Sequence, residues 1–493
     1  MAPSLLGYHK RVVCPVCRFP FAYGIVFDKP DPKKMHAKCP NCGQNNIDIS
    51  GVPRNQGDQL LVLKHAFSFI LPDRWEVIVF RNPNNPTQAY VKRVVGLPGE
   101  DLLIVDGDIW INGDIARKNL TQQRAIRIPV FDSQFEPSDE VWQSRWKADG
   151  QWKSSTNGRF SLKQPRGVEG TRKESLSWIG YEHWIRSGGE HHSVVPIAAW
   201  PSQVKIPNPI FSPLRFDARR GQLTCQGVMA DDLRDSMLSQ SKDSAFRDSI
   251  WNLYQESHMS PIDDRYGYNR SSVLTEHTSV RDLMVSMQIA LNSGRGEMVV
   301  RMTDGRNVYD CLFDFGQDEL RVMKDVANAE PLIQIPLPKK LLSTNFLFEM
   351  SLFDQNLLIA VDGETLVDRP FDSVRNPNSK LIAPRRPVSI AAKGLDVDIR
   401  DLRLFRDVFY TSKSARNGVA TSFRSGNDEY FCLGDNSPVS LDSRAWDVAA
   451  VNRRMLLGKP ILVHLPSKPA KLRIGRYESY FRIPDFSRIR YIR

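Results

Sequence analysis

The stretch VKRVVGLPGE, residues 91–100, decides how the chain folds around it. Its apolar residues are dense enough for a buried β-strand, and Leu-Pro-Gly ends the run in a turn. Lys92 and Arg93 stand inside that apolar run. A lysine in such a place is either a solvated strand residue or a buried amine, and the residues by themselves leave both interpretations open.

Strand patterns also surround this stretch. EVIVF (76–80) and AYVKRVV (89–95) are apolar runs of strand type. Two hairpin signals follow, Asp106-Gly107 and Asn112-Gly113. Together these patterns predict antiparallel β structure for the region.

Three blocks stand out along the chain: GDQLLVLKHAF (57–67), PDRWEVIVFRNPNNPTQAYVKRVVGLPGE (72–100) and CLGDNSPVSLDSRAW (432–446). In this order they resemble the bacterial signal peptidase I family, serine endopeptidases with a Ser/Lys dyad. The resemblance covers roughly residues 50–120 and 428–470. It implies a mostly antiparallel β domain and an endopeptidase that cuts signal peptides from preproteins after small residues.

The resemblance implies that Lys92 is the general base of the dyad. A lysine acts as a base only when its amine is neutral, and burial among apolar groups such as Val91, Val94 and Val95 favours the neutral amine. Without the resemblance, a solvated strand lysine is the simpler interpretation.

The third block supplies the residues that support the base. By the resemblance, Ser440 falls where a hydroxyl hydrogen-bonds the lysine, and Asp442 and Arg444 fall where an ion pair braces the site. The alternative for that pair is an ordinary surface turn. Ser437 is a departure, because the family usually has arginine after Gly-Asp-Asn.

The family motif at the nucleophile is Ser-Met-x-Pro-Thr, followed shortly by Gly-Asp. DISGVPRNQGD, which begins at Asp48, makes Ser50 the candidate nucleophile, since Ser50 and Pro53 keep the spacing. Gly51 and Arg54 depart from the motif, and a carboxylate at Asp48 would repel a developing oxyanion. The alternative is a loop serine between domains.

Four cysteines lie in the first 42 residues as CPVC and CPNCG: Cys14, Cys17, Cys39 and Cys42. Two Cys-x-x-Cys knuckles suit one tetrahedral zinc ion, and four thiolates leave no open position, so the ion would be structural. The alternative is a pair of disulfides. His36 is a weaker ligand candidate. The remaining cysteines, Cys225, Cys311 and Cys432, are expected to be buried thiols, and no cofactor is expected for catalysis.

About 300 residues separate the two peptidase-like halves. Strand-like runs with Asp-Gly turns between residues 205 and 410 predict a β-sandwich that resembles laminin-G and concanavalin-like jelly rolls. FRDSIWNLYQESH (246–258) suggests a short helix. The predicted fold class is mainly β, with a signal-peptidase-type domain split by the sandwich. The predicted domains are a zinc ribbon (1–46), the first peptidase half (47–140), a linker or irregular segment (141–204), the sandwich (205–410) and the second half (411–493).

The charge pattern bears on location and partners. The net charge is +11, with Lys and Arg spread along the chain, which argues against nucleic acid and permits weak attraction to anionic membranes. We find no transmembrane segment, because the best apolar window, Phe67 to Phe80, is interrupted by Pro72 and three charged residues, and no secretory signal. We predict a cytoplasmic or peripheral membrane location, although the family is normally membrane-anchored.

Three functions follow from these patterns. The first is a signal-peptidase-like endopeptidase acting on peptides or preproteins through Ser50 and Lys92. The second is a catalytically degenerate scaffold that holds protein or carbohydrate partners with the ribbon and the jelly roll. The third is a carbohydrate-binding protein dominated by the jelly roll, but no residue pattern marks its sugar site.

Overall fold

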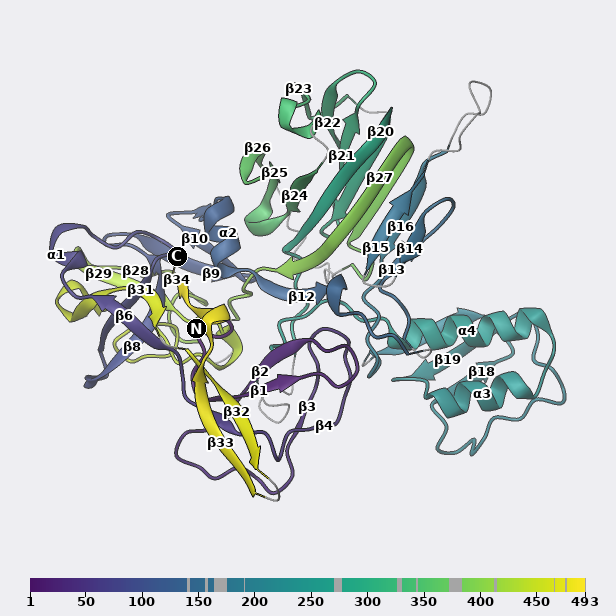
Figure 1. Ribbon diagram of the computed structural model, residues 1–493, viewed down its shortest axis with the longest axis horizontal. Helices are drawn as coiled ribbons and strands as arrows, with labels where there is room; N and C mark the ends of the chain where they lie inside the picture. The colour runs from purple at the N-terminus through teal and green to yellow at the C-terminus, as the bar shows by residue number, and fades with distance from the viewer. Residues whose placement is uncertain are drawn as a thin grey trace.

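The structure is a computed structural model (Figure 1). It describes residues 1–139, 142–155, 158–163, 175–189, 191–269, 277–325, 330–342, 345–371, 384–411, 415–464, 466–474 and 477–492. The described residues are mainly β, as the sequence predicts, and they form several sheets around separate apolar cores.

Two antiparallel sheets form the peptidase-like part. The larger sheet has the order β30-β29-β8-β7-β31-β34, with β6 also paired to β31. Strand β8 (Asn85–Gly96) lies between β7 (Val77–Asn82) and β29 (Glu429–Leu433), which joins the two halves of the sequence in one sheet. The other strands are β6 (Gln59–Leu63), β30 (Val451–Asn452), β31 (Leu456–His464) and β34 (Arg490–Tyr491), and the short helix α1 (Ala66–Phe69) packs beside β31.

The smaller sheet of this part has the order β11-β10-β9-β28. Its hairpin between β9 and β10 turns at Asp106-Gly107, one of the predicted hairpin signals. The helix α2 that follows starts with a capping box in which Asn119 and Gln122 bond each other's backbone N–H groups. The bounds are β9 (Asp101–Val105), β10 (Asp108–Ile111), β11 (Asp114–Ile115), β28 (Phe423–Arg424) and α2 (Leu120–Ile126).

A β-sandwich occupies the middle of the chain, at the top of Figure 1. Two long strands, β20 (Leu283–Thr303) and β27 (Val388–Arg406), pair along their length. The first half of β20 pairs with β24 and its second half pairs with β21. The long strands β20 and β27 therefore belong to both layers of the sandwich. The two strands approach each other closely where Gly294 meets Gly394, because a Cβ on Gly294 would lie 2.4 Å from the Gly394 carbonyl oxygen.

The remaining strands of the sandwich enclose one apolar core with these two. They are β12 (Ile128–Asp132), β13 (Trp146–Ala148), β14 (Lys153–Ser155), β15 (Arg159–Leu162), β16 (Ser177–Tyr181), β21 (Val308–Asp314), β22 (Glu319–Lys324), β23 (Ile333–Pro336), β24 (Phe346–Ser351), β25 (Asn356–Val361) and β26 (Glu364–Pro370). Short 3₁₀ turns stand at Ser133–Phe135, Lys339–Leu342, Phe353–Gln355, Ser437–Val439, Arg453–Met455 and Phe486–Arg488.

Within the segment expected to be a linker or irregular, 141–204, the described residues include five strands, β13 to β16 and β17 (His192–Pro196). Trp146, Trp152 and Tyr181 break a simple apolar alternation in the sequence, yet all three are buried in the core of the sandwich. The prediction of irregular structure was therefore wrong where strands form, because the aromatic residues that hid the pattern are themselves core residues.

Residues 192–258 make a separate unit with its own core. The strands β17 (His192–Pro196), β18 (Leu214–Asp217) and β19 (Gln222–Gln226) form a sheet, against which α4 (Ser244–His258) packs together with α3 (Asp231–Ser239). Phe246, Ile250 and Leu253 lie on one face of α4 and are buried. The predicted helix is present, but this unit is not part of the sandwich as its predicted boundary at 205 required.

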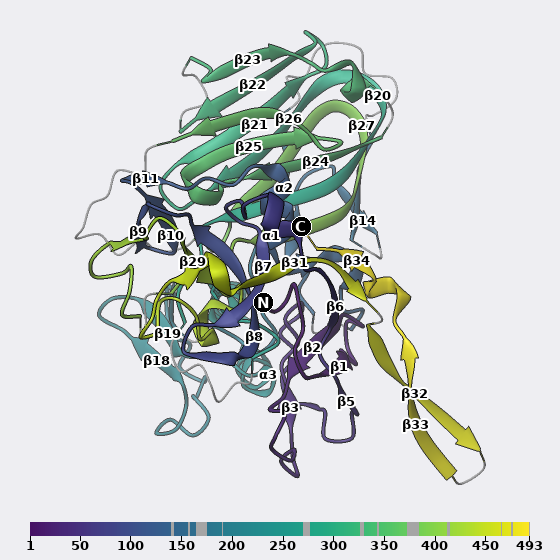
Figure 2. The ribbon, with the colours of Figure 1, turned by 90° about the vertical axis from the view of Figure 1, so that its left-hand side faces the viewer.

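The ribbon lies beside the peptidase-like part (Figure 1). Strand β1 (His9–Val13) pairs with β2 (Pro20–Gly24) and with β5 (Arg54–Asn55), and β3 (His36–Ala37) pairs with β4 (Ile47–Asp48). The ribbon thus extends to residue 55, beyond the expected boundary at 46. The hairpin of β32 (Ser467–Ile474) and β33 (Tyr477–Pro484) projects from the body in Figure 2. No helix in the described part of the chain is long and apolar enough to cross a membrane.

Candidate active site and cysteine cluster

Lys92 lies in the middle of strand β8. It pairs with Ile78 of β7, and its side chain is on the same face of the sheet as Val94, which belongs to an apolar cluster with Ile78 and Trp446. Val91 and Val95 are on the opposite face, since side chains alternate along a strand. The apolar surroundings that the sequence predicts for Lys92 therefore come from Val94 and from neighbouring strands.

The second half of the chain brings a hydroxyl to this lysine. The Lys92 Nζ atom donates a hydrogen bond of 2.8 Å to Ser440 Oγ, across 348 residues of sequence. Gly434 makes the approach feasible: a Cβ there would lie 2.2 Å from Ser440 Oγ and 3.2 Å from Lys92 Nζ. The sequence shows Gly434 only as part of Gly-Asp-Asn, and its role depends on the tertiary contact.

Burial lowers the pKa of the Lys92 amine below its ordinary value of 10.5. Asp442 opposes this shift and Arg444 adds to it, because a nearby carboxylate stabilises the ammonium and a nearby guanidinium destabilises it. In the described part of the chain Lys92 forms no ion pair. The lysine is thus a partly buried amine whose hydrogen-bond partner is a neutral hydroxyl.

Asp442 and Arg444 form a buried bidentate ion pair. Arg444 Nε donates to Asp442 Oδ1 at 2.9 Å and Nη2 donates to Oδ2 at 2.7 Å, while the Gly434 N–H donates to the same Oδ2 at 3.0 Å. Burial raises the pKa of the Asp442 carboxyl, but Arg444, Lys92 and the Gly434 N–H together more than offset this, so that the pKa is lowered. The pair is almost completely buried and fixes the turn that carries Ser440.

Ser437 has a place in the same network. Its Oγ accepts from Arg444 Nη1 at 2.8 Å and from the Thr411 N–H at 2.8 Å. The serine that departs from the family pattern therefore binds the guanidinium of the brace rather than standing in solvent.

Arg93 and Asp435 form a second buried pair that sequence reasoning did not single out. Arg93 Nε donates to Asp435 Oδ1 at 2.9 Å, Nη2 donates to Oδ2 at 2.8 Å, and Nη1 donates to the Trp75 carbonyl at 2.6 Å. The sequence could have pointed to this pair, because Arg93 directly follows Lys92 and Asp435 directly follows Gly434 within the blocks that carry the resemblance. The two pairs fix both sides of the lysine site.

Ser50 lies in the ribbon and has other partners. Its Oγ accepts a hydrogen bond from the Met35 N–H at 3.0 Å, its N–H donates to Asp48 at 2.9 Å, and its carbonyl accepts from Lys10 Nζ at 3.3 Å. The structure brings together Lys92, Ser440, Asp442 and Arg444, and it does not bring Ser50 into their hydrogen-bond network.

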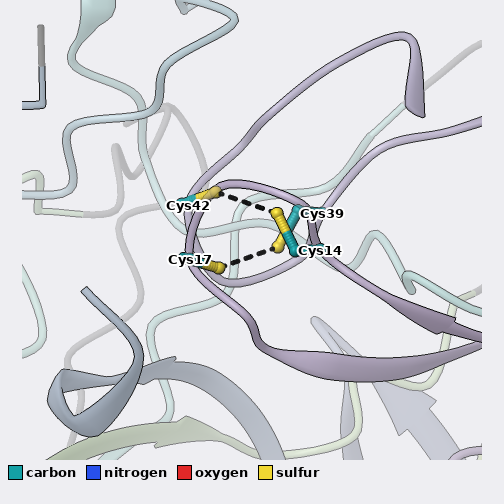
Figure 3. A group of neighbouring side chains, drawn as sticks. All are labelled: Cys14, Cys17, Cys39 and Cys42. Carbon is teal, nitrogen blue, oxygen red and sulfur yellow. Dashed lines mark hydrogen bonds between the residues drawn. The ribbon is translucent and has the colours of Figure 1, made fainter. Parts of the chain in front are cut away.

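The four ribbon cysteines converge on one point (Figure 3). Cys14 Sγ lies 3.8 Å from Cys42 Sγ, and Cys17 Sγ lies 3.6 Å from Cys39 Sγ. Disulfides have S–S bonds of about 2.05 Å, so the disulfide alternative does not fit. A tetrahedral thiolate site with metal–sulfur bonds of about 2.3 Å has sulfur–sulfur edges of about 3.8 Å. The cluster therefore fits a metal ion, and the exposed His36 is not part of it.

A third group of titratable residues lies where the sandwich meets the peptidase-like part. Carboxylate oxygens of Asp108, Asp282 and Asp354 lie within 4.8 Å of one another. Lys118 Nζ pairs with Asp354 and, at 2.8 Å, with Asp407. Burial raises the pKa of Asp108 to about 7 and that of Asp354 to about 6. This group holds the two parts together through one shared lysine.

Comparisons with known proteins agree with the peptidase-like fold of the first half. The family model described as "Signal peptidase, peptidase S26" matches residues 53–157. The match includes Lys92 and begins after Ser50.

Curated relatives match over short segments. Signal peptidase I of Rickettsia rickettsii (strain Sheila Smith) is 46% identical over 41 residues, which is 8% of this chain and 15% of the relative. Signal peptidase I of Pseudomonas fluorescens is 31% identical over 127 residues, 22% of this chain and 45% of the relative. The chain thus spans less than half of the length of these relatives.

Among solved structures, the carbohydrate binding module CBM66 from Bacillus subtilis is similar at 16% identity. That match has a TM-score of 0.17 and covers 26% of this chain and 72% of that one.

Proposed function

We propose that this protein is a serine endopeptidase of the signal peptidase type, with Lys92 as its general base. The observation that carries the proposal is the partly buried hydrogen bond between Lys92 Nζ and Ser440 Oγ, which joins the two separated peptidase-like segments of the sequence. The family match over residues 53–157 supports it. We propose peptides or preproteins with small residues before the scissile bond as the substrates.

The residues divide the work as follows. A neutral Lys92 amine takes the proton of a hydroxyl nucleophile as the hydroxyl oxygen attacks the scissile carbonyl carbon. Lys92 then gives that proton to the leaving amine as the C–N bond breaks. In deacylation the same amine takes a proton from water. Ser440 orients the lysine, and the Asp442–Arg444 pair holds the turn of Ser440. Ser50 stays a prediction as the nucleophile, and in that role its hydroxyl would have to leave the Met35 N–H.

The cysteine cluster would hold a structural zinc ion. All four sulfur atoms are buried, and four thiolates fill a tetrahedral shell, so no position remains for substrate or water. The ion would supply folding energy to the ribbon and no chemistry to the peptide bond.

Contact with a membrane surface belongs to the same proposal. Phe69 and Ile70, at the end of helix α1, are 89% and 72% exposed, and Leu71 follows them. Such a patch of large apolar side chains suits insertion into the boundary of a lipid bilayer. Phe69→Ser with Ile70→Ser should reduce cosedimentation with anionic phospholipid vesicles, whereas Phe211→Ser, at an exposed site in another unit, should not. Equal loss from both proteins would contradict the role of α1.

A second candidate function is a scaffold that keeps the peptidase fold without turnover. It is favoured by one observation, that Ser50 is held within the ribbon by Met35 and Asp48. A scaffold would bind peptide without cleaving it, so the same assay separates the two functions.

The test is cleavage of a fluorogenic peptide with alanine before the scissile bond, by the purified protein. Lys92→Ala should lower kcat/KM by about 10²–10⁴-fold, the usual contribution of a general base. Lys153→Ala, at an exposed lysine of the sandwich, is the matched control and should leave kcat/KM unchanged. Cleavage that survives Lys92→Ala would refute the proposal.

A further inference from the structure

A large cleft lies where the ribbon, strand β12 of the sandwich and the C-terminal part of the chain meet. Its volume of about 720 Å³ is within the range of about 300–1,000 Å³ that ligand sites occupy. Strand β2 of the ribbon and the segment 262–269 form parts of its wall. Neither Lys92 nor Ser440 is among the described residues that line it, so the cleft is separate from the lysine site.

Cationic side chains outnumber carboxylates in the wall of this cleft. Asp263 is the one carboxylate among the lining residues that the structure describes. Carboxylates pair with three of the lining arginines at 2.6 to 2.8 Å, and the wall keeps an excess of positive charge beyond these pairs. The cationic lining residues are Arg11, Lys38, Arg265, Arg406, Arg488 and Arg490.

Arg406 is a buried cation of this wall, with an exposed fraction of 2%. Its guanidinium donates to the carbonyls of Asp407 at 2.9 Å and Arg265 at 3.2 Å, and it lies over the ring of Tyr266. It forms no ion pair with any residue in the described ranges. A buried guanidinium without a carboxylate is costly, so an anionic group bound in the cleft would stabilise it.

Strand β2 presents an open edge to the same cleft. It is the outer strand of the order β2-β1-β5. The Phe19 carbonyl accepts from the Cys14 N–H of the β1 side at 3.0 Å, and alternate residue pairs bond from there on, so the backbone groups of Ala22 and Gly24 face away from β1. The Gly24 N–H donates to the Tyr268 carbonyl at 2.7 Å, whereas neither backbone group of Ala22 has a partner in the described part of the chain. Ala22 lines the cleft, so its N–H and carbonyl are open to an added strand.

We propose that the cleft binds an extended acidic segment of a partner protein, which adds as a strand to the free edge of β2. Main-chain hydrogen bonds to Ala22 would hold the backbone of the segment, and the cations of the wall would receive its carboxylates. A nucleic acid would use the cations but would leave the strand edge unpaired, so the edge favours a peptide. The proposal does not depend on the role of Lys92.

The first experiment tests the main-chain pairing on the unaltered protein. Fluorescence anisotropy measures binding of the labelled hexapeptide Glu-Val-Asp-Thr-Glu-Val. N-methylation of alternate residues in one register should weaken binding at least about tenfold, because the methyl groups block the peptide edge that pairs with β2, and methylation in the other register should have no effect. Equal affinities of the two methylated peptides, or tighter binding of a hexathymidylate than of the acidic peptide, would overturn the proposal.

The second experiment changes the strand edge. Ala22→Pro removes the N–H that faces the cleft, a change that an edge strand accommodates, and should weaken binding of the hexapeptide about fivefold to tenfold. Ala22→Ser keeps the N–H and is the matched control. Equal affinities of these two variants would contradict pairing at β2, and if Ala22→Pro does not fold, the methylated peptides decide.

The third experiment changes the charge of the wall. Lys38→Glu with Arg490→Glu should weaken binding of the hexapeptide at least about tenfold, because two cations become anions. Lys153→Glu with Arg220→Glu alters the net charge equally at exposed sites of other units and should leave the affinity unchanged. Equal weakening by both pairs would reduce the binding to general charge attraction and would overturn the proposal.

Discussion

Two lysines, the buried Lys10 in the ribbon and the half-buried Lys92 in the peptidase-like sheet, each lie close to a serine, but their surroundings differ. Lys10 Nζ pairs with Asp31 at 3.1 Å and donates to the carbonyls of Ile49 at 2.9 Å and Ser50 at 3.3 Å. Lys92 Nζ donates to the hydroxyl of Ser440.

The two amines differ in what their partners can do. A carboxylate and two carbonyls can only accept hydrogen bonds, so each of these partners of Lys10 is an acceptor. A hydroxyl can accept from an ammonium or donate to a neutral amine, so it tolerates both forms of Lys92. Ser50 therefore stands beside a lysine held by acceptors, and Ser440 is itself a partner that can also donate.

Removal of the metal should give the largest difference in stability between the ribbon and the peptidase-like sheet. Structural zinc contributes about 10–16 kcal/mol of apparent binding free energy in zinc-finger peptides, so a strong chelator, or Cys39→Ser, should unfold the ribbon around Lys10. Strands β7, β8 and β29 contain none of its ligands and should keep their fold. Hydrogen exchange read peptide by peptide measures this, with Cys225→Ser as the control. Protection lost equally in β8 and β1 would contradict two independent regions.

The second-largest effect is expected at the Asp442–Arg444 ion pair, which braces the lysine site. Asp442→Ala leaves the Arg444 guanidinium buried without its carboxylate, which should cost about 3–5 kcal/mol of unfolding free energy. The matched control is Asp447→Ala, which breaks a pair with Arg416 whose side chains are 81% and 70% exposed. Its cost should stay below about 1 kcal/mol. Urea denaturation measures both, and similar costs would mean that the brace is an ordinary surface turn.

Two glycines test whether the loop of Ser50 shares the site. Gly434→Ala places a methyl group 2.2 Å from Ser440 Oγ, so it should cost about 1–3 kcal/mol and break the Lys92–Ser440 bond. Gly51→Ala meets no atom within 4 Å and should alter neither stability nor cleavage. A Gly51→Ala variant that lost cleavage as Gly434→Ala does would place the ribbon loop in the active site.

The smallest expected effect is a shift in the pH dependence of kcat/KM, which should respond to the surroundings of Lys92 and not to Lys10. Because burial lowers the pKa of Lys92, the neutral base accumulates at a pH below 10.5, and kcat/KM should rise with pH through that lowered pKa. Asp442 holds this pKa up, so Asp442→Asn should move the rising limb to lower pH. Lys10→Met should leave the midpoint unchanged. A midpoint that moved with Lys10 and not with Asp442 would reverse the assignment of the base.

The sequence by itself determined the parts whose signals are local or specific. Paired Cys-x-x-Cys knuckles predicted a cluster that one loop can close, and alternation with Asp-Gly turns predicted mainly β structure. The blocks around Lys92 and Ser440 identified both members of a contact that spans 348 residues, because those residue types recur at fixed spacing in the family.

Only the tertiary structure decided what depends on chain segments meeting. The strands within 141–204 were missed because their tryptophans and tyrosine look irregular in sequence but fill a core. Ser50 matched the motif along the chain, whereas its hydroxyl accepts from the Met35 N–H and Lys92 donates to Ser440. A linear pattern cannot show these partners, because they depend on segments far apart in the sequence that only the fold brings together.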